Sequence, residues 1–151
     1  MNDKDRKLAQ FVEITQEDMT EKRICQWVNR CYESGRTVVL RVKNEKSAGR
    51  LDGQLWTFED MGFVPHAVFG GAAAPSVEPV LICPENVEPP GRDVLIEASA
   101  GEPCPCFKSF NHVIDFAEIY DEQLKEAARR RYKAYKAAGY NMRMIRENDA
   151  K

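Results

Sequence analysis

Cysteine and histidine are the first residues to consider as metal ligands or as a nucleophile and its base in this 151-residue chain. Cys104-Pro105-Cys106 forms a C-x-C pair, and His112 follows six residues after it. Structural zinc sites use about four nitrogen or sulfur ligands, commonly as two spaced pairs. Because the sequence offers one such pair, its spacing disfavours a metal site, and we expect no metal ion or other cofactor.

Catalytic residues are equally hard to find. No spacing orients a cysteine towards a histidine, as a nucleophile and its base require, and the sequence has no G-x-S-x-G motif. His66 follows a proline in an apolar stretch, and His112 begins a predicted strand. We expect both histidines to be hydrogen-bonded structural residues. The sequence therefore predicts no catalytic residue.

A phosphate-binding loop is also missing. Nucleotide-binding α/β domains place a glycine-rich turn between a strand and a helix. The first two predicted strands are followed by TQED (15–18) and KNE (43–45), which contain no glycine, and Gly70-Gly71 fits neither nucleotide fingerprint. A small α/β enzyme or a nucleotide-binding protein therefore remains only the alternative interpretation.

Apolar runs of strand length alternate with amphipathic helices, which is typical of an α/β fold with a mostly parallel sheet covered on both faces. Strands are predicted over 7–14, 37–42, 79–83, 93–96 and 112–116, with a short apolar stretch over 63–69. Helices are predicted from Thr20 as N-cap to residue 33, from Asn44 as N-cap to residue 56, and over 121–138 before Gly139. We expect a single domain over 1–151, and the pattern leaves the tail from about residue 142 open to be flexible.

Composition narrows the class of protein. Hydrophobic residues make up 43% of the chain and charged residues 30%, which is typical of a globular domain. The net charge of −2 argues against direct DNA binding, which favours a basic excess. No apolar run is long enough for a membrane span, and residues 1–5 do not resemble a signal peptide. Five cysteines in such a chain are expected to be thiols of a cytoplasmic protein.

The last predicted helix has an unusual charge distribution. Between Asp121 and Arg146 there are eight basic and three acidic residues, a local net charge of +5. On a helical wheel, four cations fall within about 80° of one another with a tyrosine at their edge: Lys125, Arg129, Lys133, Lys136 and Tyr132. We call the four cations the cationic arc. An adjoining apolar face can dock on the sheet. The arc is either an ordinary solvated face or a binding site for an acidic peptide.

A pair of aromatic residues, Trp56 and Phe63, points to a second surface. Leu55 falls on the inner face of its predicted helix, so Trp56 beside it can point elsewhere. Exposed aromatic side chains in a globular domain favour a protein partner. The alternative interpretation is an aromatic cluster in the core.

The same residues belong to an ordered set of motifs. These are RLDxxLW (50–56), FVPH (63–66), RDVLI (92–96) and LKxxARxRYKAYxxAG (124–139). In this order, from about residue 7 to residue 141, the chain resembles the chi subunit of the bacterial DNA polymerase III holoenzyme.

The resemblance implies a non-catalytic accessory subunit of the clamp loader, with a Rossmann-like fold that lacks a nucleotide site. It implies two partners: the psi subunit, and the acidic C-terminal tail of single-stranded DNA-binding protein. In some relatives a helicase competes with psi. Such a protein would act at the replisome, in the cytoplasm.

The resemblance also assigns residues to each partner. It places Lys125, Arg129, Tyr132 and Lys133 in the tail site, and Trp56 and Phe63 on the psi-binding surface. Over 117–120 the chain is one residue longer than the family pattern, so either Ala117 or Ile119 would form an apolar wall of the tail site.

Overall fold

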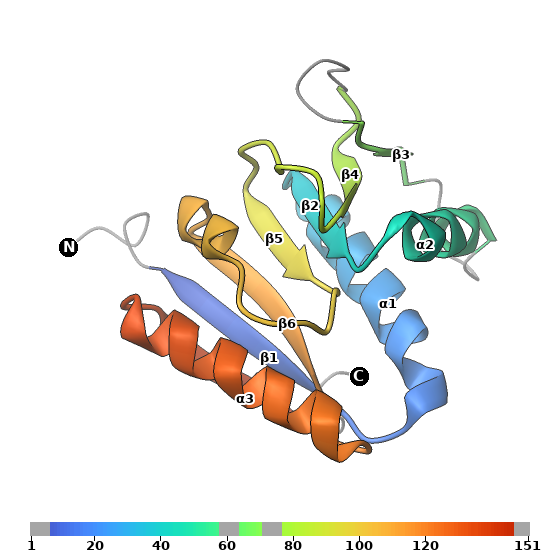
Figure 1. Cartoon of the computed structure of the whole chain (residues 1–151). Coiled ribbons are helices and arrows are strands. Elements are labelled where there is room, and N and C mark those ends of the chain that lie inside the picture. The colour runs from blue at the N-terminus through green and yellow to red at the C-terminus, as the bar shows by residue number, and fades with distance from the viewer. Residues whose placement is uncertain (1–6, 58–63, 71–76, 147–151) are drawn as a thin grey trace.

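One parallel sheet organises the molecule. The computed structural model describes residues 7–57, 64–70 and 77–146, and within them seven strands form a sheet in the order β3-β4-β2-β5-β6-β1-β7. Figure 1 labels all of these strands except β7. Every strand pairing is parallel. The predicted α/β class, with a mostly parallel sheet, is confirmed.

The elements follow the predicted order closely. The strands are β1 (Leu8–Ile14), β2 (Val38–Val42), β3 (His66–Val68), β4 (Val80–Pro84), β5 (Val94–Glu97), β6 (His112–Glu118) and β7 (Asn141–Ile145). The helices are α1 (Thr20–Glu33), α2 (Glu45–Thr57) and α3 (Glu122–Ala137), with short 3-10 helices η2 (Glu17–Met19) and η3 (Pro105–Ser109).

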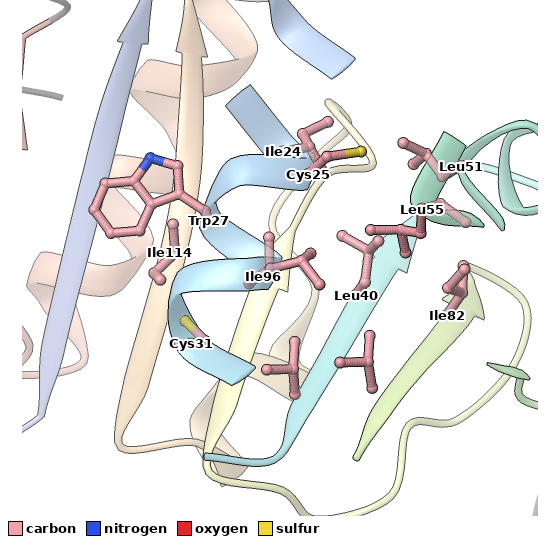
Figure 2. Packing of buried hydrophobic residues seen from close by; sticks show 14 of the residues in the cluster. Ile24, Cys25, Trp27, Cys31, Leu40, Leu51, Leu55, Ile82, Ile96 and Ile114 are labelled. Carbon is pink, nitrogen blue, oxygen red and sulfur yellow. The ribbon is translucent and has the colours of Figure 1, made fainter. Parts of the chain in front are cut away.

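Helices cover both faces of the sheet, which makes three layers. On one face, apolar side chains of α1 and α2 pack against β2, β4, β5 and β6, as Figure 2 shows for Trp27, Leu51 and Leu55. On the other face, α3 and η3 enclose a second cluster that includes Phe11, Phe107 and Tyr135. Because both faces are covered, β2, β4 and β5 are buried along their whole length.

The ends of the helices agree with the sequence in two of three cases. Asn44 caps α2, because its side-chain oxygen accepts a hydrogen bond from the Ser47 amide at 2.8 Å. Gly139 follows α3 with a φ of +92°, as a left-handed cap requires. The prediction that Thr20 is the N-cap of α1 is wrong. The chain is already helical through η2, Met19 is the N-cap, and the Thr20 hydroxyl donates to Glu118 instead.

Strand β7 is an element that the sequence did not predict. Its residues pair in parallel with β1, from Leu8 opposite Asn141 to Val12 opposite Ile145. Met142 packs on the α3 side of the sheet, and Ile145 packs on the α1 side. Residues 141–145 therefore form an edge strand of the sheet.

His112, the first residue of β6, makes stability depend on pH. Its Nε2 atom lies against the Gln10 side chain, as expected for a structural histidine. Burial, aided by Arg36, lowers the pKa of His112 to about 4. In the unfolded chain the His112 side chain has a pKa near 6.5 and becomes protonated below that pH, whereas in the folded chain it stays neutral down to about pH 4. The free energy of unfolding should therefore fall as the pH drops from about 6.5 to 4.

We expect the free energy of unfolding to decrease by about 1–2 kcal/mol across that interval, since the ring is only partly buried. Urea denaturation at pH 7 and pH 4.5 measures this decrease. His112→Gln should remove most of it. An equal decrease in the variant would show that His112 is not its cause.

Candidate functional site

The carboxyl ends of β2 and β5 form the place where a Rossmann-like sheet would hold a ligand. The chain leaves β2 towards β3 and β4 but leaves β5 towards β6, so the strand order diverges between them. Here Arg41 donates to Glu97 at 2.8 Å, and both side chains are at least 94% buried. Ser99 donates to the other oxygen of Glu97. The protein's own side chains fill this point of the sheet, in agreement with the lack of a phosphate-binding loop.

The two cysteines of the C-x-C pair lie beside that ion pair, at the start of η3. Burial and the neighbouring Cys104 raise the pKa of Cys106 to about 12, so Cys106 remains a protonated thiol. A thiol of this kind is a poor nucleophile and a poor metal ligand. Among the described residues no three metal-ligating side chains come together, and none of the helices there is long and apolar enough to cross a membrane.

His66 has a structural environment, as predicted. Its Nδ1 atom lies 2.6 Å from the carbonyl oxygen of Val64, and its Nε2 atom lies 3.2 Å from that of Asp52. The ring therefore ties the start of β3 to α2.

Arg131 belongs to the core and not to the charged surface of α3. Its guanidinium donates to both carboxylate oxygens of Asp115, at 2.9 and 3.1 Å, and to the carbonyl oxygens of Gly101 and Phe116. The Tyr135 hydroxyl donates to the same carboxylate at 2.7 Å, and burial raises the pKa of Tyr135 well above its usual value. Residues 121–146 therefore present less positive charge to solvent than their net charge of +5 suggests.

The cationic arc lies on the outside of α3. Arg129, Lys133 and Lys136 are exposed, and Lys125 is half-buried. Among the described residues, no carboxylate lies within ion-pair distance of the three lysines, whereas Arg129 donates to Glu126 at 2.6 Å. Arg130 points to the other flank of α3, where Glu102 accepts two hydrogen bonds from its Nε atom.

An apolar floor lies next to the arc. Tyr132 is half-buried, and its ring centroid lies 5.5 Å from that of Phe11 in β1. Phe11 is paired with Met144 of β7, whose side chain is 45% exposed, and Met142 packs in the same cluster as Tyr132. Charged side chains and an exposed apolar surface therefore meet where α3 overlies β1 and β7. Sequence reasoning grouped the residues of α3 but missed Phe11 and Met144, because strand pairing brings them there.

Both candidates for the apolar wall of the tail site lie near the carboxyl end of β6. Ala117 is 7% exposed and belongs to the cluster beneath α3, whereas Ile119 is 37% exposed. The Ile119 amide donates to the Ile14 carbonyl, so the ladder with β1 continues past the end of β6. Ile119 is therefore the more accessible of the two side chains.

Trp56 lies at the other end of the sheet. It is the largest exposed apolar side chain among the described residues, at 56%, and its ring centroid lies 4.7 Å from that of His66. Val68 in the edge strand β3 is 46% exposed. Of the two alternatives that the sequence left open for Trp56, the structure supports the exposed position. Phe63, the second predicted psi-binding residue, lies outside the described residues.

These features define a Rossmann-like α/β protein that presents a cationic helix face at one end of its sheet and an exposed tryptophan at the other. Residues 7–143 match the family model described as "DNA polymerase III chi subunit, HolC". The DNA polymerase III subunit chi of Escherichia coli (strain K12) is 33% identical over 122 residues, which are 81% of this chain and 82% of that protein.

Two other chi subunits are similar over most of their length. That of Haemophilus influenzae is 32% identical over 141 residues, 90% of this chain and 94% of the relative. That of Pseudomonas aeruginosa is 29% identical over 118 residues, 77% and 78% respectively. The chain belongs to the DNA polymerase III chi subunit family and is a replication accessory subunit.

Proposed function

We propose that this chain is a non-catalytic adaptor of the polymerase III holoenzyme. It binds the psi subunit of the clamp loader on one side and the acidic C-terminal tail of single-stranded DNA-binding protein on the other. Such an adaptor acts in the cytoplasm, at the replisome. The observation that supports it best is the cationic arc of α3, which borders an apolar floor where the half-buried Tyr132 and the exposed Met144 adjoin the buried Phe11.

This combination suits a short acidic peptide that ends in an aromatic residue and a free carboxylate. Lys125, Arg129 and Lys133 follow one another at intervals of four residues, so their charged groups can converge on neighbouring carboxylates. The fork of Arg129 matches two carboxylate oxygens. Tyr132 covers the apolar end of the peptide at a small cost in entropy. A contact of this size is expected to be micromolar, about −8 kcal/mol.

The two partners have separate places on the protein. Trp56 lies in α2 beside the edge strand β3, whereas the cationic arc lies above β1 and the opposite edge strand β7. Seven strands leave six spacings of about 4.8 Å, so the two edges are roughly 29 Å apart. One chain can therefore hold both partners at once, and many tails on one DNA strand would strengthen the attachment through avidity.

Arg129→Ala should weaken binding of the tail peptide at least tenfold, about 1.4 kcal/mol. Arg129→Lys should restore only part of the affinity, because lysine keeps the charge but loses the fork. Wild-type binding should weaken as salt is added, and the alanine variant should show a shallower dependence. Calorimetric titration of the peptide into each protein measures these effects.

Arg130→Ala is the matched control, because it removes the same charge from the next position of α3, on the flank that faces Glu102. It should leave peptide affinity within about twofold of wild type. Equal affinity of wild type, Arg129→Ala and Arg129→Lys would show that the cationic arc is an ordinary solvated surface.

A further inference from the structure

Glu126 is the one carboxylate among the described residues that pairs with a cation of the cationic arc. Its Oε1 atom accepts a hydrogen bond from Nη1 of Arg129 at 2.6 Å, across one turn of α3. Both side chains are well exposed, at 58% for Arg129 and 48% for Glu126. Glu126 therefore already occupies Nη1 of Arg129, one of the guanidinium nitrogens that a peptide carboxylate could bind.

The position of Glu126 also places its negative charge where it can repel an acidic peptide. On the helical wheel Glu126 falls beside Lys133, about 20° further round, so its negative charge borders the surface that an acidic peptide must approach. A peptide carboxylate that binds Arg129 through Nη1 must displace Glu126, and one that binds the Nε and Nη2 edge lies close to it. Both consequences oppose binding.

We propose that Glu126 is an intramolecular competitor that limits how tightly the cationic arc holds an acidic peptide. This inference rests on the proposed function of the arc. Exposed ion pairs of this kind are weak, so a peptide can displace Glu126 rather than be excluded by it. The Glu126–Arg129 pair keeps the binding of each single tail weak and quickly reversible. Tight binding then requires several tails acting together.

Glu126→Gln tests the competition, because glutamine keeps the size of the side chain and removes its charge. The probe is a synthetic acidic peptide that ends in an aromatic residue with a free carboxylate, titrated calorimetrically. We expect the variant to bind it about two- to fivefold more tightly than wild type. The gain should shrink at high salt.

Two comparisons separate competition at Arg129 from a general change of charge. In an Arg129→Ala background, Glu126→Gln should gain much less, because the competitor acts mainly through Arg129. Glu102→Gln removes the same charge from the Arg130 pair on the other flank and should leave the affinity near that of wild type.

The results that would overturn the competition by Glu126 differ from the result that would overturn peptide binding by the cationic arc. Unchanged or weaker peptide binding by Glu126→Gln, with normal binding by wild type, would overturn the competition and leave the binding site intact. A gain of equal size from Glu102→Gln would also overturn it, since it would then be a long-range charge effect. Failure of the wild-type chain to bind the peptide would instead overturn the proposed function.

Discussion

Replacing Arg131 with alanine should lower the free energy of unfolding by about 3–5 kcal/mol, the cost of leaving a buried charge without its partner. The Asp115 carboxylate is 1% exposed and accepts two hydrogen bonds from Arg131. Without them it keeps the Tyr135 hydroxyl and the Phe116 amide as partners, but no positive charge. Urea denaturation followed by circular dichroism measures the loss.

The neighbouring Arg130 supplies the control for this prediction. Its side chain is 51% exposed and its partner Glu102 is 64% exposed, so Arg130→Ala should cost less than about 1 kcal/mol. The double variant Asp115→Asn with Arg131→Met should be more stable than Arg131→Ala alone, because it removes both charges together. A loss below 1 kcal/mol for Arg131→Ala would contradict the buried position of the pair.

Trp56→Ala should weaken binding of psi by about 2–4 kcal/mol, or roughly 30- to 1,000-fold, and barely change the melting temperature. The side chain is 56% exposed, so its removal opens no large cavity in the core. Titration of psi into the variant, together with thermal melting of the variant alone, measures both effects.

Trp27, the other tryptophan of the chain, provides a matched contrast. It is 7% exposed and packs in the core between α1 and the sheet, as Figure 2 shows, so Trp27→Ala should lose about 3–5 kcal/mol of stability. Arg129→Ala should leave psi binding unchanged, since it lies on the far side of the sheet. A large fall in the melting temperature of Trp56→Ala would show that Trp56 supports the core.

The central strands were predictable because their physical cause is local. β2, β4 and β5 are buried on both faces, and a strand in that position needs a continuous apolar run. β7 has no such signal. It is an edge strand with the sequence Asn-Met-Arg-Met-Ile, and its side chains are exposed or half-buried, so only its pairing with β1 defines it.

The buried charges show a different limit of sequence reasoning. The local net charge of +5 includes Arg131, although this residue falls at about −120° on the helical wheel, among residues of the docking face. Its partner is a lone aspartate within the apolar run of β6, which was a second signal. Each residue alone suggests solvent exposure, and only their pairing across 16 residues of sequence explains their burial.

The candidate site, too, could be predicted from the sequence only in part. Helical periodicity grouped Lys125, Arg129, Tyr132 and Lys133 because all four lie on α3. The other residues of the apolar floor, Phe11 and Met144, come from β1 and β7, which are more than 120 residues apart in sequence. The sequence shows Glu126 only as a charge, because its pairing with Arg129 is a feature of the structure.

Simultaneous binding of psi and the acidic tail by one chain is what the proposed adaptor requires. Sedimentation velocity of the chain mixed with psi and a fluorescent tail peptide measures it, because it reports the size of the species that contains the dye. We expect that adding psi shifts the dye to a larger species without changing the peptide affinity, and that Arg129→Ala removes the dye from that species while psi stays bound. Release of the peptide when psi binds, or no association of the peptide with the chain at all, would show that the chain is not such an adaptor.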